Sequence, residues 1–204
     1  EEWRAATGPD AAVVAADLAG DGAPERVAAA AAIPFGSPDI LVNAAGLNPR
    51  QPAQEVTREA WEATLAINLT APFLLARALV PAMRARGWGR IVNFASLQSF
   101  RAFPAGIAYG ASKGGVAQLT RAMAEAWSQH GITANALGPG FFPTELTGPV
   151  FADPERAAAN AAQTCIGRNG RLEDIDGPLL FLCSEASAYV TGQILMVDGG
   201  FTAK

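Results

Sequence analysis

The sequence is poor in the residues that usually carry metal or disulfide chemistry. Its 204 residues include only two cysteines and one histidine. Cys165 and Cys183 lack the C-x-x-C spacing of a redox or zinc motif, so we expect two reduced thiols in a cytoplasmic protein and no metal site. His130 precedes Gly131 at the end of a helical stretch, which favours a helix terminus over a catalytic base.

Charge is sparse as well, at 17% of residues, and the net charge is −4. An acidic chain without a run of Lys or Arg is a poor candidate for nucleic-acid binding. The first residues lack the basic and apolar regions of a signal peptide. No apolar stretch is expected to reach the roughly 18 residues needed to span a bilayer, so we expect no membrane association. Half of the residues are hydrophobic, enough for a large core and a buried subunit interface.

Short apolar runs alternate with longer helical segments, which predicts an α/β fold with a doubly wound parallel sheet of the Rossmann type. The expected strands are residues 11–16, 40–42, 90–95, 132–137 and 193–197. The expected helices are residues 24–32, 57–86, 108–129 and 172–184, with Thr57 as an N-cap. Residues 141–153 should form an irregular cover, and a short helix can start at Pro154. No repeat or linker interrupts residues 1–204, which indicates one domain.

The sharpest chemical signal is the segment Tyr109-Gly110-Ala111-Ser112-Lys113, with Ser96 thirteen positions upstream. A spacing of four residues places Tyr109 and Lys113 on one face of a helix. A lysine ammonium beside a phenol should lower its pKa, which suits the tyrosine for general acid–base catalysis. Ser96 follows a strand at its carboxyl end, where open α/β sheets bind their ligands. Tyr and Lys at this spacing also occur by chance, so the motif gains weight only from its surroundings.

Those surroundings resemble the short-chain dehydrogenase/reductase family over nearly the whole chain. The matching segments come in the family's order and at its spacing. They are Asp17-Leu18, Asn43-Ala44-Ala45-Gly46, Asn68, Gly89-Arg90-Ile91-Val92-Asn93 leading to Ser96, Tyr109 with Lys113, Asn135 with Pro139-Gly140, and Val197-Asp198-Gly199-Gly200.

The resemblance implies NAD or NADP as cofactor and a catalytic set of four residues. Tyr109 would donate or accept the substrate proton, Lys113 would bind the nicotinamide ribose, and Ser96 would orient the substrate oxygen. Asn68 would hold a water that relays protons from Lys113. The implied cofactor contacts are Asp17, Leu18, Asn43, Ala44, Gly46, Tyr109, Lys113, Pro139, Gly140, Phe142 and Thr144. Asp17 could instead cap a turn.

Two longer segments, residues 135–147 and 197–204, are similar to the gluconate 5-dehydrogenase branch. This implies a sugar acid or polyol as substrate, with Gln98, Ser99, Arg101 and Glu145 as candidate polar contacts. Arg101 could pair with a carboxylate, or be a solvated loop arginine. The phenylalanines of residues 100–103 and 141–142 leave open a 3-oxoacyl (acyl carrier protein) thioester substrate. A non-catalytic subunit or inactive fragment of the same fold is the alternative of another class.

A complete member of this family opens with a strand, a Gly-rich phosphate-binding turn, a helix and a second strand. Nothing upstream of Asp17 matches this unit, so we expect a domain lacking its first βαβ unit. The absent strands would separate the strand at residues 11–16 from that at 40–42 by about three strand spacings, or ~14 Å. By resemblance, the helices of residues 57–86 and 108–129 would build a homotetramer, or a dimer as the alternative, through Ala111, Ala117, Ala122 and Ala126.

Overall fold

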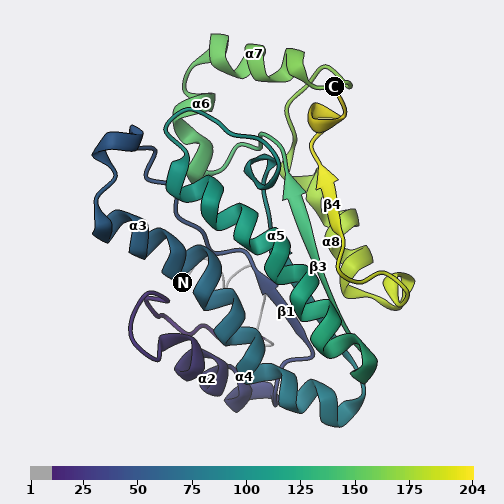
Figure 1. Ribbon diagram of the computed structural model, residues 1–204. Coiled ribbons are helices and arrows are strands. Elements are labelled where there is room, and N and C mark those ends of the chain that lie inside the picture. Colours follow the sequence, from purple (N-terminus) through teal and green to yellow (C-terminus); the bar gives the residue numbers. More distant parts are fainter. Residues whose placement is uncertain (1–10) are drawn as a thin grey trace.

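Four parallel strands form the sheet of the computed structural model, which describes residues 11–204 (Figure 1). They are β1 (Ile40–Asn43), β2 (Gly89–Phe94), β3 (Ile132–Pro139) and β4 (Ile194–Val197), and they lie side by side in that order. The register pairs Asn43 with Asn93 and Asn93 with Ala136. Because all four strands run the same way, their carboxyl ends meet at one edge of the sheet.

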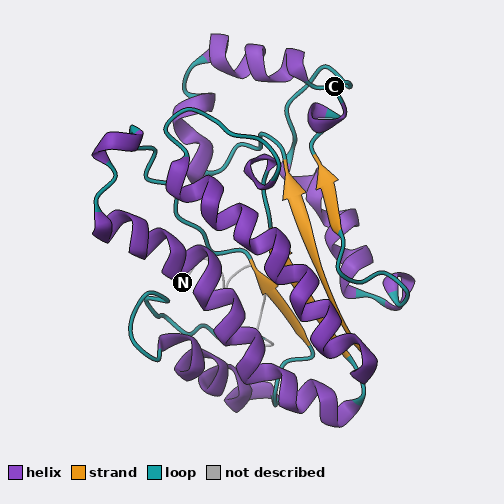
Figure 2. Ribbon diagram, in the orientation of Figure 1, coloured by secondary structure: helices purple, strands orange, loops and turns teal. Residues whose placement is uncertain are grey.

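Helices cover both faces of this sheet, as the doubly wound fold requires (Figure 2). The α-helices are α2 (Ala23–Phe35), α3 (Arg58–Leu65), α4 (Ala71–Arg86), α5 (Ile107–Trp127), α6 (Gly148–Phe151), α7 (Pro154–Gln163) and α8 (Asp176–Cys183). Single turns of 3-10 helix lie at Ala53–Glu55, Leu97–Ser99, Ser128–His130, Glu145–Thr147, Leu172–Ile175, Glu185–Ser187 and Phe201–Ala203. The predicted fold class is therefore confirmed.

The core lies in two layers, one on each face of β2 and β3. On one face, α4 and α5 bury side chains such as Leu79, Met83 and Met123 against Ile91 and Ile132. On the other face, α8 packs Leu182 against the sheet (Figure 1). Neighbouring residues of a strand enter different layers, as Ile91 and Val92 of β2 do, because successive strand side chains point to opposite faces.

A continuous helix runs from Arg58 to Arg86 through a π-helical turn at Ala66–Thr70. The Thr57 hydroxyl caps its start by accepting a hydrogen bond from Ala60 N at 3.1 Å. By length and composition this helix could cross a membrane, so the expectation that no apolar stretch is long enough was wrong. Many of its buried residues, such as Leu79 and Met83, belong to the core described above, which is typical of a core helix. The π turn contains Asn68.

Residues 11–16 form no strand, so the strand predicted there was wrong. The distance predicted between that strand and the strand at residues 40–42 therefore cannot be compared with the structure. The segment contains only small and β-branched residues that find no neighbouring strand to pair with. It leads into a turn in which the Asp17 carboxylate accepts from Ala19 N at 3.0 Å. Asp17 therefore caps this turn, and its contact with the cofactor stays a prediction.

The helix end expected at His130 is present. Gly131 has a φ of 77°, and a Cβ added there would stand 1.9 Å from the Gly87 carbonyl oxygen. Only glycine fits this turn without strain or collision.

Candidate active site

Tyr109 and Lys113 lie one turn apart in the first half of α5, and both side chains are buried. The Lys113 Nζ stands 5.6 Å from the centroid of the Tyr109 ring. It donates a hydrogen bond of 2.5 Å to the Phe94 carbonyl oxygen at the end of β2. The predicted spacing therefore does bring the phenol and the amine together at the carboxyl edge of the sheet.

Burial shifts both groups towards their neutral forms. It raises the pKa of Tyr109 above its ordinary value of 10, and it lowers the pKa of Lys113 to about 8. The expectation that Lys113 lowers the pKa of Tyr109 is not met here. The two groups that oppose burial are the Ser96 hydroxyl, through a side-chain hydrogen bond, and the Arg50 guanidinium, through its charge.

Ser96 reaches Tyr109 from the end of β2. Its backbone is extended, and its hydroxyl accepts a bond of 3.1 Å from Gln98 N, which starts the turn Leu97–Ser99. The sequence placed Ser96 after a strand, and in the structure its hydroxyl is near enough to the phenol to lower the pKa of Tyr109. Ser96, Tyr109 and Lys113 thus form one cluster.

Asn68 joins this cluster from the π turn between α3 and α4. Its amide donates to Leu47 O and to Ser112 Oγ, both at 2.9 Å, and accepts from Leu47 N at 2.7 Å. A Cβ added to Gly46 would stand 3.7 Å from Asn68 Oδ1 and 4.0 Å from Lys113 Nζ. Asn68 therefore fixes the loop after β1 beside the amine, and glycine keeps the space there open.

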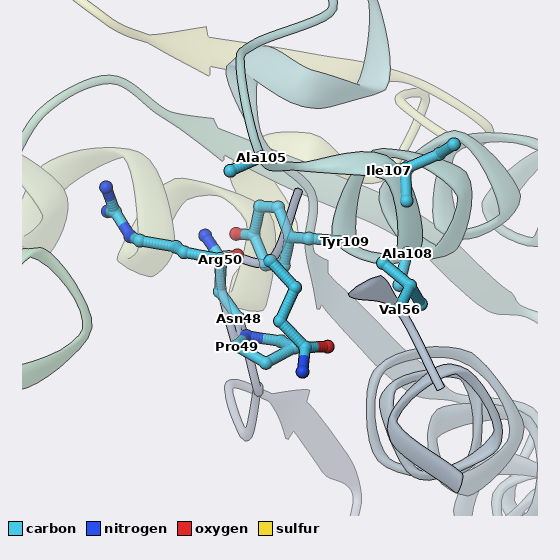
Figure 3. A pocket seen from close by; sticks show the side chains of 9 residues that line it. Asn48, Pro49, Arg50, Val56, Ala105, Ile107, Ala108 and Tyr109 are labelled. Carbon is cyan, nitrogen blue, oxygen red and sulfur yellow. The ribbon is translucent and has the colours of Figure 1, made fainter. Parts of the chain in front are cut away.

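A pocket beside Tyr109 is built by two loops that meet across it (Figure 3). Gln51, in the loop after β1, forms an isolated parallel bridge with Gly106, at the start of α5. The residues next to this bridge, Arg50 and Ala105, have positive φ angles of 50° and 56°. Such a backbone is costly for residues other than glycine, by about 1–3 kcal/mol each, and is typical of functional sites.

Arg50 is the site residue that the sequence did not indicate. It follows Gly46 by four positions and matches no motif, and its effect on Tyr109 comes from tertiary proximity alone. In the pocket its side chain extends outward beside the phenol (Figure 3). One guanidinium nitrogen donates to the Leu146 carbonyl oxygen at 3.4 Å.

The segment after β3 is bound to the segment after β4. A Cβ added to Gly140 would stand 2.9 Å from Asp198 Cα, so the backbones of the two segments lie in close contact. The Phe142 ring is buried against Gly170 and leaves only its backbone for a ligand. Thr144 is exposed, with its hydroxyl 3.0 Å from that of Thr147.

The remaining predicted residues lie in different surroundings. Leu18 packs against the core, while Asn43 is buried at the end of β1 with its amide on Asn93, and Ala44 after it is exposed. Arg101 and Glu145 are exposed, and the Arg101 guanidinium stands over the Phe201 ring at 5.2 Å. The Gln98 amide oxygen lies against Gly106 and Gly110 on α5. None of Gln98, Arg101 and Glu145 is among the residues that line the pocket.

A family model described as enoyl-(acyl carrier protein) reductase matches residues 1–202. The chain belongs to the short-chain dehydrogenase/reductase family. The gluconate 5-dehydrogenase of Gluconobacter oxydans is 43% identical over 168 residues, which are 82% of this chain and 66% of that protein. The 2-dehydro-3-deoxy-D-gluconate 5-dehydrogenase of Bacillus subtilis is 42% identical over 81% of this chain and 65% of its own length. The chain thus spans just under two thirds of these curated relatives.

Solved structures of short-chain dehydrogenases give the same result for the fold. A Beutenbergia cavernae chain assigned as an NAD(P)-dependent gluconate 5-dehydrogenase, with NADP bound at low occupancy, matches all of this chain and 81% of its own. The TM-score is 0.92 and the identity 44%. A gluconate 5-dehydrogenase from Burkholderia cenocepacia, in complex with NADP and tartrate, has a TM-score of 0.88 and 38% identity over 93% of this chain and 74% of its own.

Proposed function

We propose that the protein is an NAD(P)-dependent oxidoreductase that interconverts a secondary alcohol and a ketone on a sugar acid. The observation that carries this proposal is the cluster of Ser96, Tyr109, Lys113 and Asn68 at the carboxyl edge of the sheet, with Arg50 beside the phenol.

The residues present fit a nicotinamide cofactor. Gly46 leaves a cradle next to Lys113 Nζ, and the exposed backbone at Ala44 and Ala45 borders it. Among the described residues, the Lys113 ammonium donates to Phe94 O, so two of its three donors remain for ribose hydroxyls. We keep both NAD and NADP, and we keep Pro139, Gly140, Phe142 and Thr144 as the contacts on the nicotinamide side.

The bound cofactor would supply or accept a hydride. In the oxidation direction Tyr109 accepts the hydroxyl proton of the substrate, and in reduction it donates that proton to the forming alcohol. Ser96 holds the same substrate oxygen beside the phenol. Asn68, fixed by Leu47 and Ser112, lies beside Lys113, where it would hold a water that relays a proton between the amine and solvent.

Arg50 favours a sugar acid over an acyl thioester. Its guanidinium is a bidentate partner for a carboxylate, and it borders the pocket that Tyr109 enters. The names of the relatives are in agreement, because they act on gluconate and its dehydrated keto form. We therefore propose Arg50 as the carboxylate contact, in place of Arg101. The 3-oxoacyl alternative is not favoured.

The experiment compares gluconate, 5-ketogluconate, a neutral hexitol and a 3-oxoacyl thioester in the full-length protein, with NAD(H) and NADP(H), by absorbance at the nicotinamide band. We expect saturable turnover of the sugar acids. Arg50→Gln should raise KM for gluconate about 10-fold or more without raising that for the hexitol. Turnover of the thioester alone would overturn the sugar-acid assignment, and no cofactor binding would favour the non-catalytic alternative.

A homotetramer remains our proposal for the assembly. α3, α4 and α5 expose the large apolar side chains Trp61, Phe73 and Ile107. Ala111, Ala122 and Ala126 are exposed as expected, but Ala117 is buried in the monomer and cannot contribute. Light scattering of the wild type and of Trp61→Glu tests the tetramer, since a charge in the interface should dissociate the assembly.

We also propose a cytoplasmic location for the protein. Both cysteines are free, and free thiols are typical of a reducing compartment.

A further inference from the structure

The Ser99 hydroxyl joins the two segments that carry the candidate catalytic groups. Its Oγ donates to the Lys113 carbonyl oxygen of α5 at 2.8 Å, and it accepts from Ser96 N at 3.3 Å. A carbonyl oxygen has two lone pairs, so Lys113 O can accept this bond besides its helical one. Ser99 is therefore committed to the protein itself, whereas the sequence suggested a contact with substrate.

Lys113 consequently holds the end of β2 at two points. Its side chain binds Phe94 O directly, and its main-chain carbonyl binds Ser96 N through the Ser99 hydroxyl. The two attachments flank Ala95, which is itself buried. Without the Ser99 bridge, the backbone at Ser96 would be held to α5 on one side only.

We propose that Ser99 is a positioning residue, which acts through Ser96 by keeping the Ser96 hydroxyl against the Tyr109 phenol. The catalytic meaning of this inference rests on the proposed function, but the geometry does not. Tyr109 is faced by Ser96 from the end of β2, by Arg50 from the loop after β1, and by Lys113 on its own helix. Ser99 binds two of these three residues, Ser96 through its N–H and Lys113 through its carbonyl oxygen, and of these two only Ser96 lowers the pKa of Tyr109.

The chain offers a direct readout because it contains only two tyrosines. Tyr189 is fully exposed, and in a Tyr189→Phe background the difference in tyrosinate absorbance between this protein and its Tyr109→Phe variant reports Tyr109. The Ser96 hydrogen bond lowers the pKa of Tyr109, so Ser96→Ala should shift the titration upward. Ser99→Ala should shift it upward by part of that amount, and Ser99→Thr, which keeps a hydroxyl, should restore it.

A double-mutant cycle separates action through Ser96 from a general loosening of the fold. If Ser99 acts through Ser96, Ser99→Ala has no further effect on the titration once Ser96 is alanine. The control is Ser187→Ala, which removes a buried serine whose hydroxyl also has two hydrogen bonds, to Leu182 O and Ser184 O. It should lower stability without moving the titration. Additive shifts, or no shift in Ser99→Ala, would overturn the proposal.

Kinetics then supply the second readout. In alcohol oxidation we expect Ser99→Ala to lower kcat about 10- to 100-fold with the KM for cofactor unchanged, as a displaced catalytic oxygen does. The limb of the pH profile that reports Tyr109 should move to higher pH. An inactive wild type would contradict the proposed function and leave the titration intact as a test of Ser99. An active wild type with an unchanged Ser99→Ala profile would contradict this inference alone.

Discussion

The buried side chain of Asn93 should be among the most costly to replace in this protein. It lies one residue before the carboxyl end of β2 and is 1% exposed. Its Oδ1 accepts from Asn43 Nδ2 at 2.9 Å, and its Nδ2 donates to Thr120 Oγ1 at 3.0 Å. The three side chains form a polar ladder that links β1, β2 and α5 through the core. Replacement with leucine keeps the approximate size of the side chain and removes both bonds.

The expected cost follows from the groups left behind. In Asn93→Leu, the buried Asn43 amide loses its acceptor, which costs about 1–3 kcal/mol, and a further net hydrogen bond worth about 1 kcal/mol is lost. We therefore expect a loss of about 2–4 kcal/mol in the free energy of unfolding. With a urea dependence of about 3 kcal/mol per molar, the unfolding midpoint should fall by about 1 M.

Urea unfolding followed by circular dichroism measures this, with two threonine variants as a matched pair. Thr120 and Thr64 are both fully buried, and each donates its hydroxyl to the carbonyl four residues earlier in its helix. Only Thr120 also accepts from Asn93, so Thr120→Val should lose about 1 kcal/mol more than Thr64→Val. Equal losses in the pair, or an Asn93→Leu midpoint within ~0.2 M of wild type, would refute the role given to the ladder.

Three further predictions concern single groups. Tyr109→Phe should lower kcat by about 10²–10⁴-fold in the dehydrogenase assay, and near-normal turnover would rule out its acid–base role. The pKa of Lys113 is lowered from 10.5 to about 8, so between these pH values the unfolded chain binds more protons and stability should rise with pH. In urea titrations, the free energy of unfolding of the wild type should rise by about 3 kcal/mol relative to that of Lys113→Met between pH 8 and pH 10.5. If the free energies of unfolding of the two proteins change with pH in the same way, the burial of the amine is contradicted. Asp198→Asn weakens the bonds of 2.7–2.9 Å that its carboxylate accepts from Gly200 and Thr202, and thermal unfolding should show a loss of about 1–2 kcal/mol, which an unchanged Tm would disprove.

The strands β1 to β4 could be predicted because each is an apolar run bounded by turn residues. The strand predicted at residues 11–16 has the same local pattern, and it fails because a strand also needs a neighbour to pair with. Pairing is a property of the tertiary structure, which a local pattern does not contain. The long helix was found from its apolar stripe, whereas its π turn at Asn68 was not.

The catalytic cluster could be predicted where one helix supplies the spacing, as for Tyr109 and Lys113. The direction of the shift in the Tyr109 pKa could not be predicted, because it depends on burial in the folded protein and on two groups distant in the sequence, Ser96 after β2 and Arg50 after β1. The same holds for Arg50, whose neighbour Tyr109 is 59 positions away in the sequence. Ser99 was found as a polar residue, but its partners show that it serves the protein rather than a substrate.

Burial drives Tyr109 and Lys113 towards their neutral forms, and the two groups that favour the phenolate of Tyr109, Ser96 and Arg50, lie after β2 and β1. The groups that oppose burial at Tyr109 therefore lie at the edge of the sheet and not on the helix that carries the Tyr-x-x-x-Lys spacing. Each of these strand ends is tied to α5 through the core side of the sheet, β1 by way of Asn93 and Thr120 and β2 by way of Ser99. Residues of the outer loops, such as Arg50, can then determine substrate specificity, while these internal hydrogen bonds maintain the pKa of Tyr109. Substitutions in the loops should accordingly change KM for one substrate relative to another, and substitutions in the ties should change the pH profile for all substrates alike.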